Sequence, residues 1–260
     1  MLLSVNGAEV FVATGGHEFD ATLPTVVLLH GAGFDHTTWA LHSRWFAHHG
    51  FGLLAPDLPG HGRSAGKPLA TIADMADWVA ALLDAAGAEK AKLVGHSMGS
   101  LIALETAARH PAKVSGLSLI GTAATMTVGP DLLKAAEAND RAAIDMVSIW
   151  GLGFQAELGG SLAPGLWMHS GAQRVLEQCR PGVLYNDLAA CNAYQGALAA
   201  AAKVTVPVTL ILGERDMMTP AKAGKALAAA LPNARTVVLP GAGHMMMVER
   251  PDELLAALRG

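Results

Sequence analysis

Short apolar runs alternate with helical patterns along most of the chain. Continuous apolar runs predict strands at residues 26–30, 52–55, 92–94, 114–120, 208–212 and 236–239. Apolar positions at helical spacing predict helices at 35–49, 72–86, 101–110 and the C-terminus. The pair Asn6-Gly7 predicts a hairpin between two further strands. Strands that alternate with helices form a mostly parallel sheet, so we expect an α/β protein with helices on both faces of its sheet.

The alternation stops between residues 122 and 203, where no apolar run of strand type occurs. Glycine and proline joints divide this stretch, for example Gly129-Pro130 and Pro181-Gly182. We therefore expect a helical cap at 122–203, inserted into a core made of residues 1–121 and 204–260. The core should hold a mostly parallel, eight-stranded sheet flanked by helices.

A serine lies at the end of one predicted strand, in the run Gly95-His96-Ser97-Met98-Gly99. The run reads G-x-S-x-G and a helical pattern follows it. At a strand-to-helix turn this sharp, side chains at the two glycine positions would collide with neighbouring backbone, and the serine hydroxyl stands clear of the sheet. This context predicts that Ser97 is a catalytic nucleophile.

Two further polar residues come shortly after later predicted strands. Asp216 comes after the strand at 208–212, and His244 comes after the strand at 236–239. Loops at the carboxyl ends of strands are where open α/β sheets place their ligands. We expect His244 to act as the general base and Asp216 to hold its tautomer. Glu214 and Asp187 are weaker candidates for the acid.

Together, these motifs resemble those of the α/β-hydrolase superfamily, among its small esterases, lactonases and carbon–carbon bond hydrolases. The resemblance rests on four segments: His30-Gly31-Ala32-Gly33, residues 57–64 (DLPGHGRS), the serine run, and residues 241–244 followed by Glu249-Arg250-Pro251. It implies the order serine, acid, histidine. Some members carry the acid after the strand that here ends at Ile120, but residues 121–125 contain no carboxylate. This absence favours Asp216.

The resemblance also implies an oxyanion hole made of backbone N–H groups. One should come from Met98, directly after the nucleophile, at the start of a helix whose dipole favours negative charge. The other should come from Ala32, although Gly33 or Phe34 would serve if the loop turned differently.

Apolar residues near the triad suggest the lining of a substrate pocket. Methionines flank each triad member, and methionine fits irregular apolar gaps. Aromatic residues of the predicted cap could form a lid, although packing the cap onto the core explains each of them equally well. The expected substrate-binding residues are Gly31, Gly33, Phe34, His96, Trp150, Phe154, Trp167, Met168, Met217 and Met245.

Composition narrows the possible partners and locations. The chain has 260 residues, 15% of them charged, with a net charge of −4 and no Lys/Arg cluster, which argues against nucleic-acid binding. No apolar run approaches a membrane span, and Met1 to Gly7 lacks a signal-peptide pattern. We expect a cytoplasmic monomer or homodimer, with Cys179 and Cys191 as free thiols and with neither metal nor cofactor.

The expected function is hydrolysis of carboxylic esters, and possibly lactones, of small to medium apolar substrates through an acyl-enzyme on Ser97. Thioester hydrolysis would need the same triad and stays open. Carbon–carbon bond hydrolases of this superfamily usually carry Asn before the nucleophile and Trp after the histidine, where this chain has His96 and Met245. A non-catalytic small-molecule receptor of the same fold is the third alternative.

Overall fold

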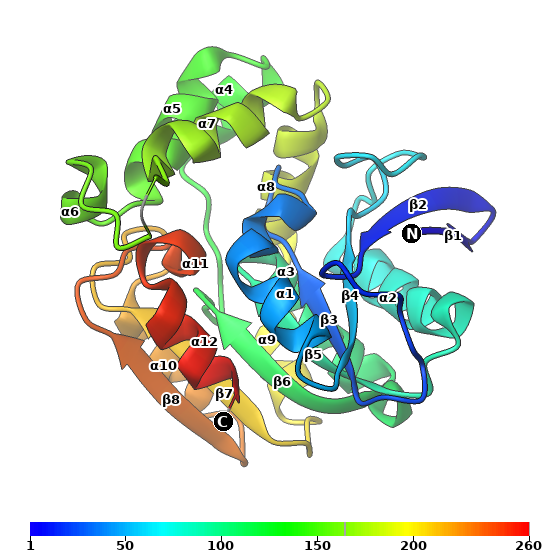
Figure 1. Ribbon diagram of the computed structural model, residues 1–260. Coiled ribbons are helices and arrows are strands. Elements are labelled where there is room, and N and C mark those ends of the chain that lie inside the picture. The colour runs from blue at the N-terminus through cyan, green and yellow to red at the C-terminus, as the bar shows by residue number, and fades with distance from the viewer. Residues whose placement is uncertain (164, 260) are drawn as a thin grey trace.

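Eight strands form one sheet in the computed structural model, which describes residues 1–163 and 165–259 (Figure 1). The strands are β1 (Leu2–Val5), β2 (Ala8–Ala13), β3 (Thr25–Leu29), β4 (Gly52–Pro56), β5 (Ala91–His96), β6 (Val114–Ile120), β7 (Val208–Gly213) and β8 (Ala234–Leu239). Their order in the sheet is β1-β2-β4-β3-β5-β6-β7-β8. The pairs β1–β2 and β2–β4 are antiparallel and the remaining pairs are parallel. The predicted fold class is confirmed.

Helices cover both faces of this sheet and divide the core into two clusters. The helices outside the insertion are η1 (His36–Trp39), α1 (Ala40–Ala47), α2 (Ile72–Ala86), α3 (Met98–Arg109), η2 (Pro111–Lys113), α10 (Ala221–Ala228), α11 (Met246–Glu249) and α12 (Pro251–Arg259). One apolar cluster joins α2 and α3 to the sheet, and the other joins α1 and α12 to the opposite face. Strands such as β3 are buried along their whole length, which explains their continuous apolar runs.

The helix expected at 35–49 is divided into η1 and α1. The Asp35 carboxylate accepts a hydrogen bond from the N–H of Thr37 at 2.8 Å and so caps a first turn of 3₁₀ type. Helix α3 begins at Met98, three residues earlier than expected, so that it follows the serine immediately.

The segment between β6 and β7 is helical wherever it has regular structure in the described residues. It holds α4 (Pro130–Glu137), α5 (Arg141–Trp150), α6 (Phe154–Glu157), α7 (Met168–Gln178), α8 (Val183–Ala193) and α9 (Ala197–Ala201). Helices α4, α5, α7 and α8 contact one another and lie over the carboxyl ends of the strands (Figure 1). Helix α9 instead packs against α3 of the core. We use the name cap for α4–α8.

None of the helices described here is both long enough and apolar enough to cross a membrane. Cys179 and Cys191 are both free thiols.

Candidate active site

Ser97 occupies a strained turn between β5 and α3. Its backbone has φ 53° and ψ −118°, a region that non-glycine residues rarely adopt. A Cβ at Gly95 would lie 2.0 Å from the carbonyl oxygen of Gly99, and a Cβ at Gly99 would lie 2.4 Å from that of Leu29. Only glycine fits at either position. The serine is therefore held at the end of β5 by the turn that the motif predicted.

His244 and Asp216 form a buried pair at the ends of β8 and β7. The Nδ1 of His244 lies 2.8 Å from Oδ2 of Asp216. The other carboxylate oxygen accepts from the N–H groups of Met218 and Thr219, at 2.9 and 2.7 Å. Burial would raise the pKa of Asp216, but the charge and hydrogen bond of His244 and the hydrogen bonds of Thr219 hold this pKa below its ordinary value.

This pairing fixes the tautomer of His244. The Asp216 carboxylate accepts the Nδ1–H, and Nε2 is left as a hydrogen-bond acceptor. Nε2 is buried and has no hydrogen-bond partner among the described residues. A ring in this state can accept a proton from a nearby hydroxyl, as a general base must.

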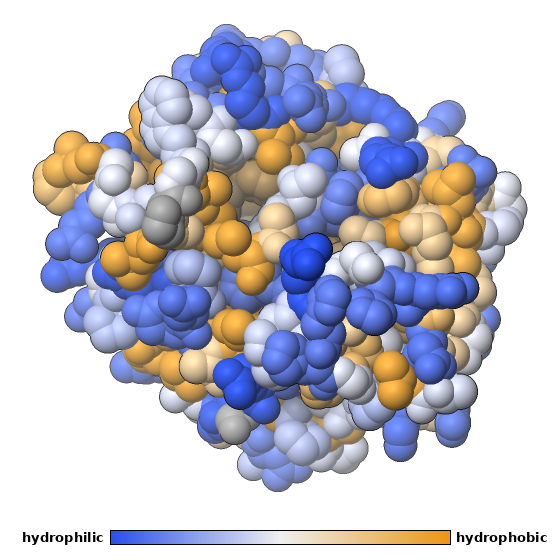
Figure 2. Space-filling model, in the orientation of Figure 1, coloured by the Kyte–Doolittle hydropathy of each residue, from blue (hydrophilic) through white to orange (hydrophobic). Residues whose placement is uncertain are grey.

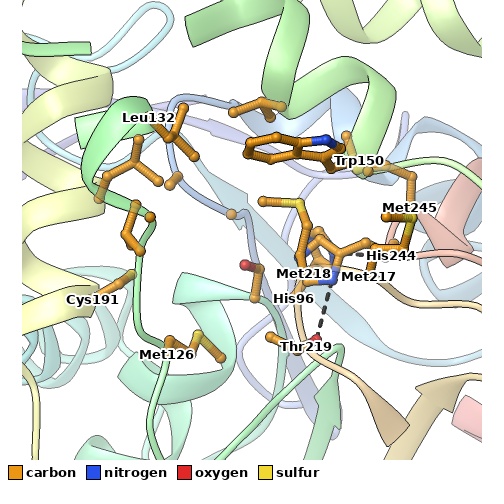
Figure 3. A pocket seen from close by; sticks show the side chains of 18 of the residues that line it. His96, Met126, Leu132, Trp150, Cys191, Met217, Met218, Thr219, His244 and Met245 are labelled. Atoms are coloured by element: carbon orange, nitrogen blue, oxygen red, sulfur yellow. Dashed lines mark hydrogen bonds between the residues drawn. The ribbon is translucent and has the colours of Figure 1, made fainter. Parts of the chain in front are cut away.

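Ser97 and His244 line the same cavity, whose volume is about 220 Å³. In Figure 3, Met217, Met218 and Met245 surround His244, and Trp150 and Leu132 lie across the cavity from Met126. The wall is mostly apolar and is formed by the core and by helices α4, α5 and α8 of the cap. The arrangement suits an uncharged substrate with apolar groups on either side of its reacting centre.

His96 lines this cavity beside His244. Its Nε2–H donates to the carbonyl oxygen of His244 at 3.0 Å, and the ring centroids are 4.7 Å apart. Burial, with the neighbouring charge of His244, lowers the pKa of His96 to about 3. His96 is therefore neutral and supports the loop that carries His244.

The loop after β3 holds the three backbone amides that the sequence suggested as alternatives for the oxyanion hole. The N–H of Gly33 donates to Oδ2 of Asp187 at 2.9 Å, and the N–H of Phe34 donates to the carbonyl oxygen of Gly31 at 3.2 Å. The N–H groups of Ala32 and Met98 have no such acceptor among the described residues. Of the three amides considered from the sequence, only that of Ala32 is thus available.

The structure brings together most of the expected pocket residues. Six of them line the cavity with Ser97: Gly31, Phe34, His96, Trp150, Met217 and Met245. Four lie outside it. Gly33 packs under the cap, and Phe154 is 73% exposed on α6. Figure 2 shows hydrophobic side chains at the left of the molecule, where Figure 1 labels α6. Trp167 and Met168 line a separate apolar cavity beside α7.

Sequence reasoning missed the cap residues that face Ser97. These are apolar side chains of α4, α5, α8 and the segment before α4: Met126, Val128, Leu132, Val147, Leu184, Leu188 and Cys191. Their spacing is that of any buried helix face, so the sequence holds no signal that separates a pocket wall from cap packing.

The weaker acid candidates lie elsewhere. Glu214 accepts a hydrogen bond from the N–H of Gly241 at 2.8 Å, and Asp187 lies on α8 and contacts His61 and Gly33. Neither carboxylate hydrogen-bonds to His244.

One described group of side chains has the spacing of metal ligands. It consists of Asp35, His36 and Asp57, and it does not line the cavity of Ser97. The Asp57 carboxylate already accepts from the N–H groups of His36 and Arg63, both at 2.8 Å. These bonds account for the cluster as a support of the loop at 57–64.

Gly121 provides a test of how tightly His244 is held. Its φ is +56°, and a Cβ there would lie 2.9 Å from Cε1 and 3.0 Å from Nδ1 of the His244 ring. Gly121→Ala should displace the ring and lower kcat for the ester hydrolysis expected from the sequence roughly 10²-fold, because a shift of about 1 Å at a group that takes part in a reaction has that effect.

Gly87→Ala is the matched control. Gly87 has φ +73° and nothing within 4 Å of its missing Cβ, so it adds similar backbone strain without touching the site. Both variants should melt at a lower temperature, and only Gly121→Ala should lose turnover. Equal kcat values for the two variants would contradict this account of His244.

Comparisons with known proteins agree with the geometry. The sequence profile described as "Alpha/beta hydrolase family" matches residues 26–258. A pimeloyl-[acyl-carrier protein] methyl ester esterase of Chromobacterium violaceum is 34% identical over 255 residues, covering 90% of this chain and 92% of that protein. The enol-lactonase from Burkholderia xenovorans shares the fold, with a TM-score of 0.88 at 24% identity over 100% of this chain and 98% of its own. A thermophilic esterase aligns with a TM-score of 0.80 at 27% identity, over 100% and 95% of the two chains.

Proposed function

This chain belongs to the alpha/beta hydrolase family, and on that premise we propose that it hydrolyses carboxylic esters through an acyl-enzyme on Ser97. One observation carries the proposal. Ser97 and His244 line one apolar cavity, Nε2 of His244 has no hydrogen-bond partner among the described residues, and Asp216 lies 2.8 Å from the other ring nitrogen. This is the arrangement that makes a serine hydroxyl nucleophilic.

Acylation begins when Oγ of Ser97 attacks the ester carbonyl carbon and its proton passes to Nε2 of His244. A carbon–oxygen bond forms, and the carbonyl electron pair moves onto the oxygen. The tetrahedral intermediate then expels the alcohol, which takes the proton from Nε2. Asp216 stabilises the imidazolium between these two proton transfers without taking up a proton itself.

Deacylation repeats these steps with water. His244 accepts a proton from the water molecule as its oxygen attacks the acyl carbon. The second tetrahedral intermediate collapses to the carboxylic acid, and Ser97 recovers its proton from Nε2. In both halves of the reaction, the N–H groups of Ala32 and Met98 donate to the oxyanion. Each such donor contributes roughly 10²- to 10³-fold to kcat.

The cap defines the class of substrate that we propose. Helices α4, α5 and α8 place apolar side chains such as Leu132, Val147 and Leu188 over Ser97. They exclude water and so strengthen the oxyanion hydrogen bonds. A cavity of about 220 Å³ limits the substrate to small or medium acyl and alcohol groups. Methyl esters and lactones both belong to this class.

We also propose that this substrate is a free small molecule, bound without nucleic acid or membrane. As a separate proposal, we place the enzyme in the cytoplasm as a monomer or homodimer.

Chain-length selectivity tests the closed pocket. Across p-nitrophenyl esters, kcat/KM should rise about fourfold per added methylene from acetate to butyrate or hexanoate, because burial of each CH₂ contributes about 0.8 kcal/mol. Longer chains outgrow the cavity, and kcat/KM should then fall. A profile that stays flat, or that still rises at palmitate, would show an open cleft.

Two variants sharpen this measurement. Leu132→Phe narrows the cavity from α4 and should move the optimum to a shorter chain, since Leu132 lines the wall. Leu158→Phe makes the same chemical change at a cap residue that is 73% exposed, and it should leave the optimum in place.

The reaction type is tested by covalent labelling and turnover together. A fluorophosphonate should modify the protein, and a panel of esters, lactones and dienoic ketones should show turnover of the first two. Labelling without turnover of any ester would favour a receptor, and turnover of the dienoic ketones alone would favour a carbon–carbon bond hydrolase.

A further inference from the structure

A fully buried carboxylate of the cap contacts the loop that carries Ala32. Asp187 lies on α8, its side chain has no exposed surface, and no step of the proposed reaction uses it. Its Oδ2 accepts from the N–H of Gly33 at 2.9 Å and lies 2.7 Å from Nε2 of His61. Oδ2 of Asp187 therefore connects the cap to two loops of the core. Gly33, one of its two partners, directly follows Ala32, the proposed oxyanion donor.

The partners of His61 require its ring to be doubly protonated. Nδ1 lies 3.1 Å from the carbonyl oxygen of Pro59, and Nε2 faces the carboxylate of Asp187. Both partners are acceptors, so both ring nitrogens must donate, and the ring is an imidazolium. Burial alone would lower the pKa of His61, but the charge and hydrogen bond of Asp187 raise it above its ordinary value.

A second histidine connects this pair to the start of the loop. The Nδ1–H of His30 donates to the carbonyl oxygen of Gly31 at 2.9 Å, and its Nε2 accepts from the N–H of Leu58 at 3.1 Å. This pattern fits only a neutral ring, and burial, with the nearby charge of His61, lowers the pKa of His30 to about 4. The two rings lie 4.9 Å apart.

The loop itself is packed under the cap. Gly33 has φ +71°, and a Cβ there would lie 2.8 Å from Leu184 and 3.0 Å from Leu176. Arg180 adds a contact between the cap and the loop of His61, donating to the carbonyl oxygen of Ser64 at 2.9 Å. The loop after β3 is thus held from His30 on one side and from α7 and α8 on the other.

We propose that Asp187 is a positioning residue for the oxyanion hole. Paired with the His61 imidazolium, it fixes the N–H of Gly33 and thereby keeps the neighbouring N–H of Ala32 directed into the cavity. This inference rests on the proposed hydrolase function of Ser97, and it makes the cap a part of the catalytic geometry as well as a lid.

The charge of His61 makes this positioning pH-dependent. The titratable groups that face the ring are Asp187 on α8, His30 after β3 and Asp57 at the start of its own loop. Since Asp187 raises the pKa of His61, the ion pair persists above the ordinary histidine range and is lost as the pH rises through the raised value. kcat should therefore fall on the alkaline side.

The decisive variant is Asp187→Asn, which keeps the side-chain shape and removes the charge. An amide oxygen can accept from Gly33 or from His61, while its NH₂ would oppose the other donor. We expect kcat for p-nitrophenyl butyrate to fall roughly 10- to 100-fold with little change in KM, as for a misplaced transition-state donor. The alkaline fall of kcat should also move to lower pH, because His61 loses its charged partner.

Two further variants separate positioning from general damage. Asp131→Asn makes the same change at an exposed residue of α4 and should behave like the parent protein. His61→Gln should lower kcat about as far as Asp187→Asn. The double variant should be no less active than the less active single variant, because each substitution removes the same His61–Asp187 ion pair. Independent, multiplicative losses would overturn the proposal.

The parent protein supplies a measurement that does not depend on the folding of any variant. Nuclear magnetic resonance of the His61 ring should show both nitrogens protonated at pH 7, and a neutral ring there would overturn the proposal. So would an Asp187→Asn protein with the parent kcat at every pH. Fluorophosphonate labelling of the parent protein distinguishes failure of this proposal from failure of the proposed function. If Ser97 did not react with the probe, the proposed function would be contradicted.

Discussion

Ser97→Ala should lower kcat for ester hydrolysis about 10⁶-fold, the loss seen when the nucleophile of such a triad is removed. In the proposed mechanism, Oγ of Ser97 is the atom that bonds to the acyl carbon, and alanine has no atom that can take its place. The fold should survive, because the substitution removes one oxygen from a half-buried side chain. The measurement is kcat for p-nitrophenyl butyrate, with melting temperature as the check on folding.

Ser115→Ala is the control for this variant, since Ser115 is an exposed serine of β6 and lies away from the cavity. It should keep the parent kcat. Turnover by Ser97→Ala within tenfold of the parent would mean that another group performs the attack.

Asp216→Asn should lower kcat about 10⁴-fold while leaving the protein folded. In the parent protein, the N–H groups of Met218 and Thr219 donate to Oδ1 of Asp216. In the variant, the amide oxygen of the asparagine can accept the same two hydrogen bonds. The amide NH₂, however, would donate to Nδ1 of His244. This bond favours the tautomer with a proton on Nε2, and that nitrogen could no longer accept the proton of Ser97.

Glu214→Gln tests the same chemical change two residues away. Glu214 binds the N–H of Gly241 rather than His244, so this variant should retain the parent kcat. If Glu214→Gln were crippled and Asp216→Asn were not, the acid would be wrongly assigned.

The sequence signals for the candidate site are strongest where local geometry determines the position of a residue. Gly95 and Gly99 are required by backbone contacts within one turn, and Asp216 and His244 follow strands whose apolar runs are easily recognised. These signals depend on neighbours in the chain or on the regular period of a buried strand. The family resemblance and the fold class rest on the same kinds of signal, and the comparisons confirm both.

The sequence could not predict which cap side chains line the pocket, because their directions depend on tertiary packing. Phe154 and Trp167 are aromatic but largely exposed, at 73% and 69%, whereas the pocket wall uses ordinary aliphatic residues such as Leu188. Asp187 reads as a weak candidate for the acid in the sequence. Its partner His61 lies 126 residues earlier, and no local pattern connects the two.

The most direct test of the central claim is to identify the residue that carries the acyl group. The protein would be mixed with p-nitrophenyl butyrate, quenched with acid within the first turnover and digested for peptide mass mapping. We predict a butyryl adduct on Ser97 in the peptide that contains Gly95 and Gly99, formed with a burst of one p-nitrophenol per protein molecule. A burst with the adduct on another residue, or steady ester turnover with no adduct and no burst even at the lowest pH that supports activity, would contradict the account.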